Sequence, residues 1–165
     1  MKRRAYIGLG ANQGDVMETA RAAIEAVRSI ERCDFVAVSA FYRSAPIDAE
    51  GPDYINAVVA LDTLHDPYAL LLHLLDLEIM LGRKRRMPNA PRNAPRKVDL
   101  DLLLVGDLII SSTPLALPHP RLHLRAFALR PLVDLAPDIV IPGHGPAAAF
   151  LRAAADQRVT PWPGA

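Results

Sequence analysis

A short apolar segment with two acidic residues near its start, residues 96–105, constrains this chain more than any other stretch. Leucine and valine dominate it up to the turn dipeptide Gly106-Asp107, which predicts a strand buried on both faces. Strand side chains alternate faces at ~3.3 Å per residue, so Asp99 and Asp101 should point to the same side, about 6–7 Å apart. Such a pair suits one or two shared divalent cations better than a hydrophobic core. The alternative is that both acids are solvated charges where a strand enters the sheet.

The residues just before this strand concentrate positive charge. Seven of the 19 basic residues lie between positions 83 and 97 with no acid among them, and the rest of the chain, with 12 basic and 18 acidic residues, has a net charge of −6. One basic segment on an acidic body indicates a local anion site, such as a metal-bound polyphosphate, and disfavours a broad nucleic-acid surface. The seven residues are Arg83, Lys84, Arg85, Arg86, Arg92, Arg96 and Lys97.

Length and composition predict a single globular domain. The 165 residues are 51% hydrophobic, enough for one core and too few residues for two domains. We expect the domain to span residues 1–160, with a loose tail over 161–165. The lone Cys33 permits no internal disulfide, and no window reaches transmembrane length, so we expect a cytoplasmic protein with no membrane partner. We also expect no nucleic-acid partner and a monomeric protein.

Periodicity predicts alternating strands and helices. The glycines at positions 8, 10 and 14 do not fit a dinucleotide-binding spacing, so the loop over 10–15 is interpreted as a strand-to-helix connection capped by Asp15. Gly82 should terminate the second helix, which would put Glu78 in its last turn. Expected strands cover 5–9, 35–43, 54–64 and 96–105, with a hairpin strand at 108–110 and a short edge strand at 138–141. Expected helices cover 16–30, 66–81, 126–135 and 147–156.

Two further features are open to more than one interpretation. Residues 83–96 contain three prolines and a doubled Asn-Ala-Pro-Arg, which predicts a long loop that is either disordered or a functional lid. His119 and His123 stand four residues apart, a spacing known from zinc sites on helices. The flanking Pro118 and Pro120, and the lack of an evident third ligand, disfavour zinc there.

Taken together, these stretches resemble the 6-hydroxymethyl-7,8-dihydropterin pyrophosphokinase family of folate biosynthesis. The most specific piece is Pro-Arg-x-x-Asp-x-Asp over residues 95–101, preceded by Tyr54-x-Asn56 and followed by Pro118-His119. Matching pieces run through nearly the whole chain in the family's order, at 6–12, 41–46, 52–57, 78–83, 94–101, 117–119 and 125–127.

The resemblance implies a ferredoxin-like single domain of the α/β (α+β) class, with a mostly antiparallel sheet, helices packed on its faces and a long basic catalytic loop. It implies transfer of the pyrophosphoryl group of ATP to the pterin's hydroxymethyl oxygen, with two Mg²⁺ ions as cofactors. The implied catalytic residues are Arg83, Arg92, Arg96, Asp99 and Asp101, the two aspartates being the metal ligands. Implied ATP-binding residues are Glu78, Arg83, Arg85, Arg96, His119 and Arg125; the implied pterin pocket contains Ser44, Ala45, Ile47, Tyr54, Asn56 and Phe127.

The chain departs from the family pattern in its basic loop. Asn93-Ala94 stand where many members have Trp-Gly, and the loop is a few residues longer than usual, so which arginines contact phosphate stays open. Two other classes remain possible: a metal-dependent nucleotidyl- or glycosyl-transferase, which also uses an Asp-x-Asp motif, and a non-catalytic ferredoxin-like ligand-binding module. The second leaves the acid pair and the basic segment unexplained.

We predict that residues 83–96 order as a lid only when ATP and metal bind. Like charges and prolines leave the free loop nothing to bury, while a triphosphate offers charge-assisted hydrogen bonds worth ~1.5–3 kcal/mol each. Arg96→Ala should therefore lower kcat far more than it raises the KM for pterin. Amide hydrogen exchange is the direct measurement: loop protection that stays the same on adding an ATP analogue with Mg²⁺ would contradict the lid.

Overall fold

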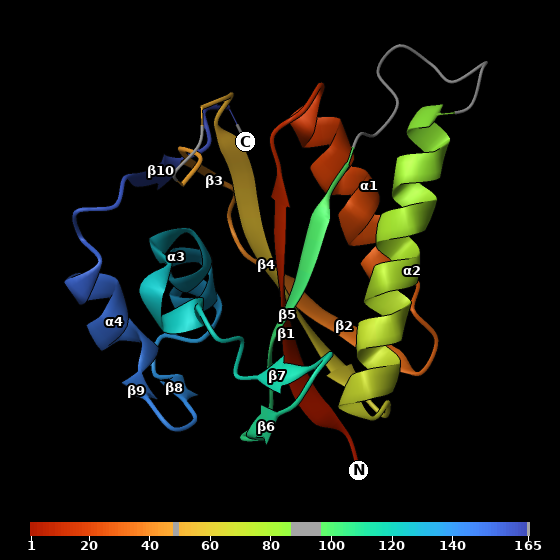
Figure 1. Cartoon of the computed structure of the whole chain (residues 1–165), viewed down its shortest axis with the longest axis vertical. Coiled ribbons are helices and arrows are strands. Elements are labelled where there is room, and N and C mark those ends of the chain that lie inside the picture. Colours follow the sequence, from red (N-terminus) through yellow and green to blue (C-terminus); the bar gives the residue numbers. More distant parts are fainter. Residues whose placement is uncertain (48–49, 87–96, 165) are drawn as a thin grey trace.

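One six-stranded antiparallel sheet organises the molecule (Figure 1). The computed structural model describes residues 1–47, 50–86 and 97–164, and only the backbone of 83–86. The strands run in the order β10-β3-β4-β1-β5, and β2 also pairs with β4. Their bounds are β1 Arg3–Ala11, β2 Cys33–Val38, β3 Tyr42–Ser44, β4 Tyr54–Thr63, β5 Asp99–Val105 and β10 Val159–Pro161.

Helices cover both faces of this sheet. Helices α1 (Val16–Arg28) and α2 (Pro67–Arg86) lie on one face, and α3 (Ala126–Leu135) and α4 (Ala147–Ala153) lie on the other (Figure 1). The order β1-α1-β2-β4-α2-β5 and the sheet order β5-β1-β4-β2 are those of a ferredoxin-like fold, to which β3, β10 and the C-terminal helices are added. The predicted fold class is therefore confirmed. Of the long basic loop expected over 83–96, residues 87–96 lie outside the described part of the chain.

Strand alternation gives the sheet a separate hydrophobic core on each face. On β1, Ala5, Ile7 and Leu9 belong to the core under α1 and α2, while Tyr6 faces α3. The α3 core adds Val58 from β4 and residues of α3 and α4. Burial of aliphatic side chains on both faces, at about 25 cal/mol per Å² of apolar area, is the main force that holds these layers together.

Helix α2 does not end at Gly82, as the sequence predicted. Its start is as expected, because the Tyr68 N–H donates to Asp66 Oδ1 at 2.7 Å. The helix continues to Arg86, however, and Gly82 is not among the residues with positive φ. A glycine ends a helix when it adopts that conformation; inside a helix it costs only ~1 kcal/mol relative to alanine. Residues 83–86 are therefore helical rather than loop, and Glu78 is not in the last turn.

The expected strand over 35–43 is divided into two. A bulge after Phe35 shifts the register of β2 against β4. Just beyond β2, the Ser39 hydroxyl accepts a hydrogen bond from the Val58 N–H of β4 at 2.9 Å. The chain resumes as β3, which pairs with the other end of β4. This break turns Val36 outward, 40% exposed, and leaves Ser44 buried.

The short elements after β5 agree with expectation only in part. Residues 108–110 do not pair with β5, because the turn that the Leu108 N–H closes onto the Val105 carbonyl directs the chain away; β6 (Ile110–Ser111) instead pairs with β7 (Ala116–Leu117). The edge strand near 138–141 pairs, as β8 (Val140–Ile141), with β9 (Gly145–Pro146), and a 3-10 turn spans Leu122–Leu124.

Regular structure continues through Pro161, the first residue of the segment that was expected to be a loose tail. Strand β10 pairs with β3, and Trp162 donates its N–H to the Phe41 carbonyl at 2.9 Å and packs against the α1/α2 core. Among the described residues, no helix has both the length and the apolar character needed to cross a bilayer.

The loop over 10–15 should serve α1 as a cap and not as a phosphate site. Asp15 accepts the Glu18 N–H at 3.1 Å, so Asp15→Ala should lower the free energy of unfolding by ~1 kcal/mol. Chemical denaturation measures this, with the exposed Asp138→Ala as the control. Loss of nucleotide binding in Asp15→Ala with stability unchanged would contradict the capping role.

Candidate active site

Three neighbouring strands, β4, β1 and β5, form the pocket floor, and the pairing of β1 with both of the others fixes their registers. On β1, Gly10 lies opposite Asn56 of β4 on one side and Asp99 of β5 on the other. Two residues earlier, Gly8 lies opposite Asp101. All of these positions face α3, and the two glycines put no side chain above the floor. A Cβ on Gly10 would come within 3.5 Å of the Asn56 amide nitrogen.

A pocket of about 560 Å³ lies above this floor. It brings together ten of the residues expected from the sequence, from five separate segments: Ser44, Ala45, Ile47, Tyr54, Asn56, Asp99, Asp101, His119, Arg125 and Phe127. Ten further lining residues were not expected from the sequence: Gly8, Leu9, Gly10, Ala57, Leu103, Arg121, Leu122, Leu124, Ala128 and Gln157.

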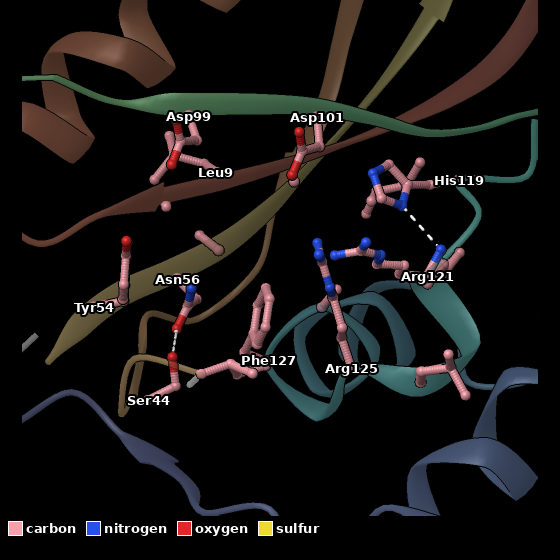
Figure 2. A pocket seen from close by; sticks show the side chains of 18 of the residues that line it. Leu9, Ser44, Tyr54, Asn56, Asp99, Asp101, His119, Arg121, Arg125 and Phe127 are labelled. Atoms are coloured by element: carbon pink, nitrogen blue, oxygen red, sulfur yellow. Dashed lines mark hydrogen bonds between the residues drawn. The ribbon is translucent and has the colours of Figure 1, made fainter. Parts of the chain in front are cut away.

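One end of the pocket combines aromatic rings with a fixed amide (Figure 2). Asn56 is 4% exposed, and its Oδ1 accepts a hydrogen bond from the Ser44 hydroxyl at 2.5 Å. That bond sets which end of the amide faces which way, so the Nδ2 group is left to donate to a ligand. With Tyr54 and Phe127 alongside, this end suits a flat heterocycle that carries hydrogen-bond acceptors.

The acid pair lies on the pocket wall formed by β5. Figure 2 shows both carboxylates pointing from the strand into the pocket, so the predicted shared face of Asp99 and Asp101 is confirmed. Burial, and secondarily the charge of Asp101, raises the pKa of Asp99, although Lys97 opposes this shift. Within the described part of the chain neither carboxylate has an ion-pair or hydrogen-bond partner, so the pair stores unfavourable negative charge.

Cationic and imidazole groups line the opposite end. His119, Arg121 and Arg125 lie together there, next to Asp101 (Figure 2). His119 Nδ1 accepts the Arg121 backbone N–H at 3.2 Å, which leaves Nε2 to carry the proton of the neutral ring. Burial, with help from Arg125 and Arg121, lowers the pKa of His119 against the opposing effect of Asp101. His119 is therefore a neutral donor at pH 7.

Glu78 lies outside the pocket, contrary to its expected place among ATP-binding residues. Its carboxylate accepts the Leu100 backbone N–H at 2.8 Å from the α2 side of β5. Burial, followed by the charges of Asp99 and Asp101, raises the pKa of Glu78 despite that hydrogen bond. Its position fits a structural task, which is to hold the segment of β5 between the two aspartates.

The expected arginines of the basic segment lie outside what the structure describes in detail. Arg83 and Arg85 belong to the last turn of α2, whose side chains are not described, and Arg92 and Arg96 fall within residues 87–96. Arg121 was not expected from the sequence, although its place two residues after His119 was a usable signal. Gln157 had no sequence signal, since only tertiary structure brings it to the pocket.

The two histidines at 119 and 123, for which a zinc site was disfavoured, do not lie together in the fold. His119 lines the pocket, whereas His123 stacks on His144 with ring centroids 4.1 Å apart. The described residues contain no group of three or more His, Cys, Asp or Glu side chains placed to hold a metal. A metal in the pocket would thus depend on the Asp99–Asp101 pair together with its ligand.

Comparison with known proteins agrees with this geometry. The family model described as 7,8-dihydro-6-hydroxymethylpterin-pyrophosphokinase (HPPK) matches residues 6–137. The chain belongs to the HPPK family. The 2-amino-4-hydroxy-6-hydroxymethyldihydropteridine pyrophosphokinase of Pseudomonas aeruginosa is 37% identical over the full length of both chains. That of Methylorubrum extorquens is 40% identical over 86% of this chain and 87% of its own.

A solved structure shares the fold. The HPPK-DHPS triple mutant of Plasmodium falciparum superposes with a TM-score of 0.73 at 13% identity, over 94% of this chain and 45% of that longer chain. Like its HPPK relatives, the present chain is a pyrophosphokinase, a diphosphotransferase of folate biosynthesis.

The charge stored in the pocket predicts a pH-dependent gain of stability in Asp99→Asn. Because the pKa of Asp99 is raised in the folded protein, its carboxyl group does not lower the free energy of unfolding when it is protonated, below the ordinary pKa of 3.8. Stability is lost as the pH rises through the raised pKa and the group ionises. Asp99→Asn should thus melt above the wild type at pH 7, and the difference should shrink toward pH 4. Thermal unfolding across this range tests it, with the exposed Asp107→Asn as control; a lower melting temperature at pH 7 would contradict the repulsion.

Proposed function

We propose that this enzyme transfers the pyrophosphoryl group of ATP to the hydroxymethyl oxygen of 6-hydroxymethyl-7,8-dihydropterin and releases AMP. The observation that carries the proposal is that one pocket combines an aromatic-amide end, a carboxylate pair and an Arg/His end. A heterocycle at the first end and a polyphosphate at the last would meet beside the carboxylates. The names of the family and of its 35–40% identical relatives support this choice of substrate.

The acid pair fits Mg²⁺. Magnesium prefers oxygen ligands and is commonly held by one or two carboxylates together with substrate phosphates. Asp99 and Asp101 supply such carboxylates from a single strand face. A cation between them would offset both the burial and the repulsion from Asp101 that raise the pKa of Asp99. We propose that they hold two Mg²⁺ ions. Bound there, the metal would neutralise charge on the triphosphate and polarise the transferred group.

The aromatic-amide end would bind and orient the pterin. Tyr54 and Phe127 would contact its flat faces, and the Asn56 Nδ2 group would donate to an acceptor on the ring. Because the Ser44 hydroxyl already holds the amide, little side-chain entropy is lost on binding. Exposed Ala45 and Ile47 would close the edge of the ring, since both line the pocket.

The Arg/His end would hold the triphosphate. Arg121 and Arg125 offer forked donors that match phosphate oxygens, and neutral His119 can donate through Nε2 without adding charge. Transfer of this kind asks the protein mainly for positioning and charge stabilisation. We extend the same role, from sequence alone, to Arg83, Arg85, Arg92 and Arg96.

Removing one carboxylate tests the metal assignment. Asp101→Ala, and likewise Asp99→Ala, should lower kcat by roughly 10²–10³-fold, the range for losing one electrostatic contact to the transition state. Folding should be intact, because neither side chain has a hydrogen-bond or ion-pair partner to lose among the residues that the structure describes. The assay is AMP formation with Mg²⁺, and Asp107→Ala, exposed and outside the pocket, is the matched control. Near-normal turnover in either variant would refute the assignment.

A second prediction separates the two ends of the pocket. Asn56→Ala should weaken pterin binding by ~1–3 kcal/mol, because buried acceptors on the ring lose their donor. ATP binding should change little, since Asn56 lies away from the Arg/His end (Figure 2). Isothermal titration with each ligand gives the answer, with Gln13→Ala as an exposed amide control. Equal weakening of both ligands would count against a dedicated pterin end.

A further inference from the structure

We propose that Gln157 is a positioning residue for the transfer, acting through Arg125 and Phe127. The inference rests on the proposed function, which gives those two side chains their roles. Gln157 lies between α4 and β10, outside the residues that match the family model, which end at 137. It is nevertheless a lining residue of the pocket.

Gln157 holds the chain on both sides of Arg125. Its Oε1 accepts the Ala126 backbone N–H at 2.9 Å, and its Nε2 donates to the Leu124 backbone carbonyl at 2.8 Å. Only this orientation of the amide satisfies both neighbours, since one is a donor and the other an acceptor. The peptide units that flank Arg125 are therefore both fixed by one side chain.

The start of α3 needs such a partner. The first N–H groups of a helix have no acceptor within the helix, and the capping position of α3 is Arg125, whose side chain forms no capping hydrogen bond. Gln157 supplies the missing acceptor from a distant part of the sequence. Phe127 is the second residue of α3, so its place at the pterin end follows from the same anchor.

The segment that carries Gln157 is itself held at both ends. The Gln157 N–H closes a turn onto the Ala154 carbonyl at 3.0 Å at the end of α4. Two residues later Val159 pairs with Ser44, the residue that orients the Asn56 amide. The C-terminal segment thus connects two pocket walls, α3 with Arg125 and Phe127, and β3 with Ser44.

Two variants separate hydrogen bonding from packing. Gln157→Met keeps the approximate size and loses both bonds, while Gln157→Glu keeps the acceptor for Ala126 and loses the donor for Leu124. The exposed neighbour Asp156→Ala is the matched control. For each protein we would measure kcat and both KM values per folded molecule, and the exchange rate of the Ala126 amide by NMR.

The expected order of kcat/KM is wild type and Asp156→Ala, then Gln157→Glu, then Gln157→Met, with the last down roughly 10- to 100-fold because small misplacements of contacting groups are costly. Ala126 should exchange faster in Gln157→Met and stay protected in Gln157→Glu. Wild-type kinetics in Gln157→Met, or a loss fully explained by a smaller folded fraction, would overturn the inference. A wild type that forms no AMP would instead defeat the proposed function.

Discussion

The double register of β1 is the constraint on which the pocket depends. Because β1 pairs with β4 and β5 at once, a single residue, Gly10, has Asn56 on one side and Asp99 on the other. The same strand places Leu9 in the core beneath. A shift of one residue in either pairing would send the amide or the acids to the face of α1 and α2. The geometry of the site is therefore fixed by the packing of the opposite face.

The pocket keeps its unfavourable charge because the surrounding fold is well supported. Asp99 and Glu78 both have raised pKa values from burial and from neighbouring acids, a cost in the free protein. The Glu78 carboxylate stays in place through the Leu100 N–H, and Leu100 and Leu102 are buried in the α1/α2 core. That core offsets the repulsion, and a metal with a polyphosphate would remove it. The free protein is therefore less stable than it could be, because it keeps these acids in place for a cation.

Local signals predicted most of the fold and part of the site. Apolar periodicity located β1, β4, β5, α1 and α3 to within a few residues, and the resemblance to the family gave the ferredoxin-like topology. The Asp-x-Asp spacing was enough to place both acids on one face. Errors arose where tertiary context decides: Gly82 stayed helical, a bulge split the strand after Phe35, and β10 formed from a segment with little pattern of its own. Gln157 could not be found from the sequence because its partners lie more than 30 residues away.

In the proposed reaction one pocket holds both substrates, so that the terminal two phosphates of ATP move together to the pterin. Phosphorus-31 NMR of the wild-type protein with ATP, Mg²⁺ and hydroxymethyl dihydropterin measures this directly. We expect equal amounts of AMP and of a pterin diphosphate, with no ADP, and no AMP when the pterin is left out. Formation of ADP with a pterin monophosphate, or release of AMP without the pterin, would contradict it.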